Sequence, residues 1–419
     1  MSFYKWKSLY IWGFAPLFLL VSFPALAEGD IPVRGETVLA RWNNEMFPLG
    51  IRAGGFLIFP KFSYSGSYDD NIFSRENNEN GDLISIFSPG VSVLSDWGRH
   101  ALNFSASLDL GRYAVFSSED YEDWDISANA QIDVQRNIQL FLGGDIKQKH
   151  ERRRSLESTQ GIEPTKYMTS SIFFRYAHEF GRFMYELGGD LERKDYKDSL
   201  SIRTGMPVLI NQDDRDRNEY TVKMTGSYEF IPGYDLFVRL SSNRRDYDVL
   251  QDVSNFNRSS WGYGIVTGLE FDYGGLILGN LNVGYQSQKY KSPLININTP
   301  VYGVLLNWNV TALTTISADI QRIIKETQNI DFSGYLSTNS LLIIHHELRR
   351  NILLNAGFEY SINDYKGHAS SELESTVFNT FIGLDYRINR YLNGSVQYSY
   401  IKRMISRNGI STGDSETNS

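Results

Sequence analysis

Six histidines and a scattered set of acidic residues are the groups in this sequence whose chemistry could support catalysis. A Ser–His or Asp–His pair would supply a general base, because histidine titrates near neutral pH. Asp364 and His368 are near enough in sequence to form such a pair, but their spacing matches no catalytic motif. We favour a solvated loop histidine. We therefore expect no enzymatic activity, and a hydrolase would have to depend on His150 or His368.

The sequence gives equally little support for a metal or cofactor site. Residues 213–216 (DDRD) lack the spaced oxygen ligands of a calcium loop, and Arg215 competes with a cation. His345 and His346 are adjacent, so in a strand they point to opposite faces and cannot share a metal. The absence of cysteine excludes thiolate ligands and nucleophiles. No phosphate loop, dinucleotide fingerprint or nucleophile elbow occurs, and we expect no cofactor.

The charge balance argues against a nucleic-acid partner. The formal net charge is −8, and the charges are spread along the chain without the basic patch that nucleic acid requires. Aromatic residues are abundant, with 26 Tyr and 25 Phe.

The first 27 residues resemble a secretory signal peptide. They combine two early lysines, an apolar run over residues 9–21 and the sequence Ala-Leu-Ala at 25–27. A membrane helix is disfavoured because the run is short and contains Gly13 and Pro16. We therefore expect residues 1–27 to be removed from a secreted chain.

The rest of the sequence alternates apolar and polar residues with a period of two. Residues 124–135 do so strictly over a dozen positions, which no helix would produce. The pattern predicts seventeen strands: 56–68, 83–96, 100–113, 124–135, 138–150, 166–178, 183–195, 218–230, 235–247, 259–272, 276–290, 300–311, 315–326, 335–348, 352–365, 374–388 and 391–404.

Short and long connections alternate between these strands. The short ones are tight turns at 96–99, 136–137, 180–182, 232–233, 273–275, 312–314, 349–351 and 389–390. The long, polar ones are 69–82, 114–123, 151–165, 196–217, 248–258, 291–299, 327–334 and 366–373. This alternation favours an up-and-down antiparallel meander over a Greek-key sandwich.

The apolar face of each strand is expected to point outward, into lipid. The strands exceed the roughly 9–11 residues that cross a bilayer, and closure into a barrel removes the exposed edges of an open sheet. Aromatic residues near strand ends are typical of membrane-interface girdles: Tyr64, Trp124, Tyr176, Tyr185, Tyr228, Tyr263, Tyr285, Trp308, Tyr360 and Tyr386. The sequence therefore predicts an all-β transmembrane barrel over residues 55–404, in a bacterial outer membrane, with residues 28–54 as a periplasmic lead-in.

The opposite face of each strand should line a hydrated lumen. Charges of both signs lie on this face, which suits a channel for polar or sugar-like cargo, or alternatively structural networks that pair across the wall. The candidate lumen-lining residues are Asp109, Asp125, Asp133, Asp145, Lys147, Arg175, Glu186, Asp190, Lys223, Arg239, Glu270, Asp319, Glu359 and Arg387.

The strand count is odd, whereas an antiparallel barrel closes with an even number. Residues 405–419 are polar and read as an interrupted extracellular loop. We expect an eighteenth strand to be truncated.

Several N-terminal segments resemble the putative β-barrel porin 2 family. The similarity is carried by residues 47–60 (FPLGIRAGGFLIFP), 68–73 (YDDNIF), 95–102 (SDWGRHAL), 111–113 (GRY) and 119–121 (EDY), and it extends over about 45–404. The resemblance implies an eighteen-strand outer-membrane barrel of a kind often linked to exopolysaccharide loci. The family's closing strand finds no match here.

Together these features predict an outer-membrane pore for exopolysaccharide export. The alternatives are a general diffusion porin for small hydrophilic solutes and a rim hydrolase. Expected partners are membrane lipid and lipopolysaccharide, the polysaccharide or solute, and periplasmic export proteins. Residues 151–154 (ERRR) would either contact lipopolysaccharide phosphates or form a charged loop base.

Overall fold

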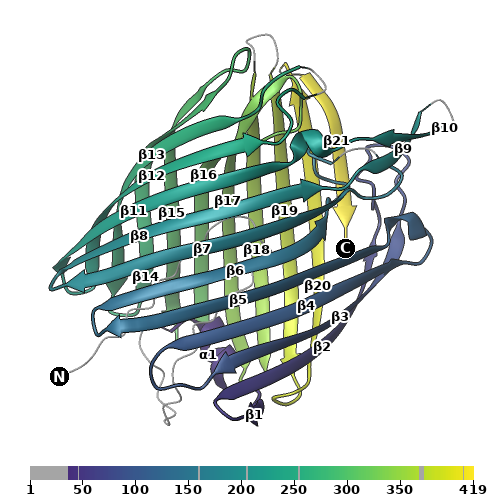
Figure 1. Cartoon of the computed structure of the whole chain (residues 1–419). Helices are drawn as coiled ribbons and strands as arrows, with labels where there is room; N and C mark the ends of the chain where they lie inside the picture. The colour runs from purple at the N-terminus through teal and green to yellow at the C-terminus, as the bar shows by residue number, and fades with distance from the viewer. Residues whose placement is uncertain are drawn as a thin grey trace.

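The protein is a β-barrel in which neighbouring strands run antiparallel (Figure 1). The computed structural model describes residues 36–45, 47–158, 161–203, 206–252, 255–367, 372–408 and 410–419. The expected signal peptide and His368 lie outside the described residues. No helix in the described part has the length and hydropathy needed to cross a bilayer.

Each of the seventeen predicted strands is present. They are β2 (Phe56–Asp69), β3 (Asp82–Ser95), β4 (Ala101–Tyr113), β5 (Tyr121–Gln135), β6 (Ile138–His150), β7 (Lys166–Phe180), β8 (Phe183–Tyr196), β11 (Arg217–Ile231), β12 (Tyr234–Tyr247), β13 (Ser260–Tyr273), β14 (Ile277–Tyr290), β15 (Ile297–Thr311), β16 (Thr314–Lys325), β17 (Phe332–Arg349), β18 (Ile352–Gly367), β19 (Leu373–Arg387) and β20 (Asn393–Arg407). Each pairs with the next along the chain, β8 with β11 included. The prediction of an up-and-down β-barrel is confirmed.

Several short elements lie before or between the long strands. A helix, α1 (Val38–Glu45), and a short strand, β1 (Ile51–Ala53), precede β2, and β1 pairs with it. The long connection between β8 and β11 holds the hairpin β9 (Ser199–Arg203) and β10 (Met206–Ile210), followed by the 3₁₀ turn η2 (Asp213–Arg215). A second such turn, η1 (Ser117–Glu119), lies between β4 and β5.

The polar tail differs from expectation. Instead of an interrupted loop, it forms an eighteenth strand, β21 (Ile410–Asn418), which pairs with β20 from Arg407↔Ile410 to Tyr400↔Asn418. The backbone N–H of Asp70, just beyond β2, donates to the Asn418 carbonyl oxygen at 3.2 Å, so the tail links the last strands to the first. The periodicity missed this strand because it contains too few apolar residues to alternate, and backbone pairing to β20 holds it.

The outer face is apolar, as the alternation predicts. Val283 and Tyr285 on β14 are 61% and 46% exposed, and Ile265 on β13 is 52% exposed. Aromatic residues stand at both ends of this face, for example Trp261 at the start of β13 and Tyr273 at its end. Exposed apolar surface of this extent is stable only against lipid.

A matched pair of arginine substitutions tests which face meets lipid. Val283→Arg places a charge on the outer face near mid-strand and should lower the free energy of unfolding by about 2–4 kcal/mol. Asn282→Arg, the adjacent residue on the inner face, should cost far less because its side chain reaches water. Urea titration of protein folded into lipid vesicles measures both, and equal costs would contradict the assigned orientation.

Candidate functional site

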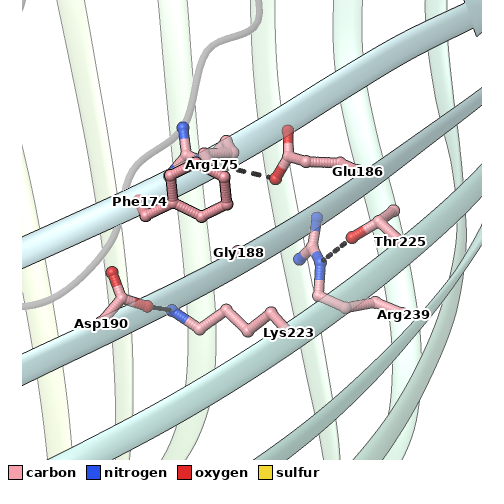
Figure 2. A pocket seen from close by; sticks show the side chains of 8 residues that line it. All are labelled: Phe174, Arg175, Glu186, Gly188, Asp190, Lys223, Thr225 and Arg239. Atoms are coloured by element: carbon pink, nitrogen blue, oxygen red, sulfur yellow. Dashed lines mark hydrogen bonds and ion pairs between the residues drawn. The ribbon is translucent and has the colours of Figure 1, made fainter. Parts of the chain in front are cut away.

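The lumen is the candidate functional site, and its wall carries ion pairs between neighbouring strands (Figure 2). Arg175 Nε on β7 lies 3.2 Å from Glu186 Oε1 on β8, and Lys223 Nζ on β11 lies 2.9 Å from Asp190 Oδ2 on β8. Arg239 on β12 donates to a threonine hydroxyl on β11 at 3.2 Å. The charges predicted to line this part of the lumen therefore neutralise one another along the wall.

A second polar group extends over β4 to β7. Lys147 Nζ lies 3.1 Å from Asp145 Oδ2, and the Ser171 hydroxyl donates to the same carboxylate. Lys149 Nζ lies 3.9 Å from Asp109 Oδ2. The Lys147–Asp145 pair lies within β6, whereas the contacts of Ser171 with Asp145 and of Lys149 with Asp109 link different strands and stiffen the wall.

The other predicted lumen residues are more dispersed. Asp133 accepts hydrogen bonds from Gln131 at 2.9 Å and Gln139 at 3.0 Å, and Glu359 accepts one from Asn379 at 3.3 Å. Within the described ranges, three of the predicted residues form neither an ion pair nor a side-chain hydrogen bond: Asp125, Glu270 and Asp319.

One sector of the wall is uncharged. Alternation with the exposed Tyr285 and Val283 places Asn280, Asn282 and Gln286 on the inner face of β14, and β15 contributes Asn307. Neither strand carries an ionisable side chain on this inner face between its ends, except the phenol of Tyr290 at the rim of β14. Amides both donate and accept hydrogen bonds, so this sector suits neutral polar groups.

The end of the lumen with the long connections is crossed by residues 151–165, which we call the crossing loop; 159–160 lie outside the described residues. On the side next to β4 and β5, Arg153 contacts both carboxylate oxygens of the buried Glu119, at 2.7 and 2.8 Å, and is itself partly buried. Glu151 forms an ion pair with Arg215. Burial raises the pKa of the Glu151 carboxyl, and the Arg215 guanidinium opposes this shift.

The far side of the crossing loop is fastened to the opposite wall. The Glu157 carboxylate accepts hydrogen bonds from the Thr327 hydroxyl at 2.9 Å, the Tyr365 hydroxyl at 2.9 Å and the Gln328 backbone N–H at 2.7 Å. Leu156 packs against a buried cluster at the ends of β17, β18 and β19. The loop leaves β6 on the front wall, whereas β18 lies on the rear wall (Figure 1). The loop therefore spans the lumen.

A third attachment reaches the strands where the barrel closes. Arg154 Nη2 lies 3.0 Å from Asp69 Oδ2 at the end of β2, and Arg403 on β20 donates to the Arg154 carbonyl oxygen. The proposal that residues 151–154 meet lipopolysaccharide is wrong for Arg153 and Arg154, whose guanidinium groups pair with buried carboxylates.

A buried ionic layer supports the same end. Glu326, just after β16, accepts hydrogen bonds from Tyr247 at 3.0 Å and Tyr290 at 2.9 Å, and it pairs with Arg245. Arg258 is also buried and donates to backbone carbonyl oxygens of the β16–β17 connection. Buried charges are tolerated when they are paired and hydrogen-bonded, as these are.

The opposite end of the lumen is covered by α1. Val38 and Trp42 pack on Leu353, whose side chain is fully buried at the start of β18. The Arg387 guanidinium carbon lies 3.6 Å from the centre of the Trp42 ring. Arg41 forms an ion pair with Glu347 at 2.7 Å.

These contacts explain why α1 is ordered, since an isolated helix of eight residues is unstable in water. The predicted lead-in over residues 28–54 thus contributes a helix to the mouth of the lumen (Figure 1). Leu353 gave a partial signal in the sequence, because it is a leucine on the otherwise polar face of its strand.

The histidines have structural environments. His150 Nδ1 lies 3.1 Å from Asp123 Oδ1, and its ring stacks on Tyr121 at 4.0 Å between centroids. His345 contacts Asn355, and no serine contacts either histidine in the described part of the chain. The described residues also contain no group of three or more potential metal ligands.

Sequence reasoning missed the residues that close the lumen. Glu157, Glu326 and Tyr365 belong to connections or strand ends far apart in the chain, and no local spacing links them. The only hint in the sequence is that charged residues occur in the long connections, and such residues are normally interpreted as solvated.

Several solved structures of outer-membrane proteins are similar in shape. The FpvAI–pyocin S2 complex matches at 10% identity and a TM-score of 0.46, covering 78% of this chain and 54% of that one. The siderophore receptor PirA from Acinetobacter baumannii matches at 8% and 0.42, covering 85% and 80%. OccK3 (OpdO) from Pseudomonas aeruginosa matches at 13% and 0.39, covering 87% and 93%. The chain thus spans about half the length of the first of these proteins.

No curated protein matches the sequence. The family comparison is decisive, because residues 46–419 match putative beta-barrel porin 2. That match agrees with the barrel, its apolar outer face and its polar lumen, and it places the protein in the bacterial outer membrane. The chain belongs to the putative β-barrel porin 2 family.

Proposed function

We propose that this pore is gated and exports a polysaccharide across the outer membrane. The observation that carries the proposal is the crossing loop, which is fastened to the wall on both sides of the lumen through Arg153 and Glu157. A general diffusion porin needs a lumen that is open at rest. A pore for a secreted polymer instead benefits from closure between transport events.

The uncharged sector of the wall supports a sugar-like cargo. Amide side chains such as Asn280, Asn282 and Asn307 can exchange hydrogen bonds with successive hydroxyl groups without the desolvation cost of a charge. Where charges are paired, as in Lys223–Asp190, the wall offers little additional attraction for ions. The wall is therefore better suited to a neutral polar chain than to selecting small ions.

The helix α1 would close the pore at its periplasmic end. Cargo entering from the periplasm would meet α1, so Trp42 has to leave Leu353 before transport. We propose that a periplasmic export partner displaces the helix. A rim hydrolase has less support, because His150 is held by Asp123 and Tyr121.

Removing the far attachment of the crossing loop should open the pore. Glu157→Ala deletes the acceptor of three hydrogen bonds. Loss of one bond to a charged group costs about 1.5–3 kcal/mol, which shifts the closed-to-open ratio roughly tenfold to hundredfold. Planar-bilayer recordings should show rare openings for the unaltered protein and frequent ones for the variant.

The matched control is Glu163→Ala, which removes an exposed glutamate from the same loop. This control should leave the currents unchanged. Large, steady currents from the unaltered protein would instead indicate a general diffusion porin.

Releasing α1 should expose Leu353. Because the chain has no cysteine, a single Leu353→Cys substitution can be labelled selectively with a membrane-impermeant maleimide. Adding Trp42→Ala removes packing worth about 3 kcal/mol and should accelerate labelling strongly. Arg390→Cys, in the exposed turn between β19 and β20, serves as the control and should label equally in both backgrounds. Unchanged labelling of the Leu353→Cys thiol would rule out α1 as a cover.

The cargo is tested in cells. Deleting the gene for this chain should abolish surface exopolysaccharide while leaving lipopolysaccharide unchanged, and Glu157→Ala should restore export. Quantifying both polymers by carbohydrate analysis separates the proposals. Unchanged exopolysaccharide, together with reduced uptake of small solutes, would favour the diffusion porin.

A further inference from the structure

A group of cationic and aromatic residues lies on the outer surface of the barrel, away from the lumen. Three neighbouring strands, β12, β13 and β14, place Arg244, Trp261 and Lys289 directly opposite one another. Tyr263 is the next outward residue of β13, and Lys291 directly follows the last residue of β14. We call these five residues the rim patch.

The cations of the rim patch are available to a ligand. Lys289 Nζ lies 4.7 Å from the centre of the Trp261 ring and 5.8 Å from that of Tyr263. Lys291 is exposed, and neither lysine forms an ion pair with the described residues. The Arg244 side chain is 70% exposed, although Asp246 neutralises it at 2.8 Å. The patch therefore keeps a net positive charge from its two lysines.

The rim patch lies where the apolar band ends. Below Trp261 and Tyr263, the outward positions of β13 continue with Ile265, and the neighbouring strands present Leu240 and Tyr285 at the same level. Above the patch, the chain enters the long connections 248–259 and 291–296. Since long connections face the exterior in bacterial barrels, the patch lies at the level of the outer-leaflet headgroups.

We propose that the rim patch binds the phosphorylated disaccharide headgroup of an outer-leaflet glycolipid of the lipid A type. Lys289 and Lys291 would pair with a phosphate, while Trp261 and Tyr263 lie against the sugar and mark the interface. The acyl chains would run down the apolar surface formed by Leu240, Ile265 and Tyr285. Charge above and hydrocarbon below match an amphipathic glycolipid better than a soluble anion.

This site is independent of the pore. It lies on the outer wall, shares no residue with the crossing loop or α1, and would hold a resident lipid whatever cargo passes through the lumen.

The experiment measures lipid binding to the folded, full-length barrel in detergent by native mass spectrometry. The probes are hexa-acylated bisphosphoryl lipid A and the same lipid after removal of both phosphates. The variants are the double substitution Lys289→Ala/Lys291→Ala and the charge-preserving Lys289→Arg/Lys291→Arg. The control is Lys402→Ala, which removes an outward lysine on β20 that is already paired with Glu416 at 2.7 Å.

The double alanine variant should bind bisphosphoryl lipid A roughly thirtyfold more weakly, from about 1 kcal/mol per lysine near a membrane surface. The arginine variant and Lys402→Ala should bind as the unaltered protein does, and the dephosphorylated lipid should bind weakly to all four. Inorganic phosphate should not compete, because it lacks the acyl chains. Equal binding of both lipids, an equal loss in Lys402→Ala, or full competition by phosphate would each overturn the proposal. Heat-modifiable gel mobility confirms that every variant is folded.

Discussion

The need to satisfy backbone hydrogen bonds inside hydrocarbon governs this structure. Unpaired N–H and C=O groups are too costly in lipid, so strands that cross a membrane must pair with their neighbours. Every long strand from β2 to β20 pairs with its sequence neighbour, and β21 pairs with β20 and reaches the end of β2 through the hydrogen bond from the Asp70 N–H to the Asn418 carbonyl oxygen. Once the strands are paired, the two-residue alternation of side chains assigns one face to lipid and the other to water.

Because the polar faces of the strands all point inward, the barrel has a charged interior that must itself be stabilised. Along the middle of the wall, neighbouring strands neutralise one another's charges, as Lys223 and Asp190 do. At the two ends, the chain fills the lumen with its own segments. The crossing loop brings arginine and glutamate side chains into buried pairs, and α1 covers the inward-facing Leu353. The lumen thus holds segments of the chain at both ends and is lined in between by charged and amide side chains, many of them paired along the wall.

The two closures differ in physical character. The crossing loop is held mainly by charge-assisted hydrogen bonds. Three of them, from Thr327, Gln328 and Tyr365, converge on the Glu157 carboxylate. The helix α1 is held by apolar packing of Val38 and Trp42, aided by stacking of Arg387.

The sequence by itself determined the seventeen strands, their orientation and the family, because side-chain alternation and turn residues are local properties of the chain. It also predicted a polar face that includes Arg175 and Asp190, and the structure shows both residues in ion pairs along the wall. It missed β21, whose polar residues carry no alternation and whose pairing to β20 is a backbone property. Only the tertiary structure decided that Glu157 meets Tyr365 and that Trp42 covers Leu353, because these contacts join segments brought together by closure of the barrel.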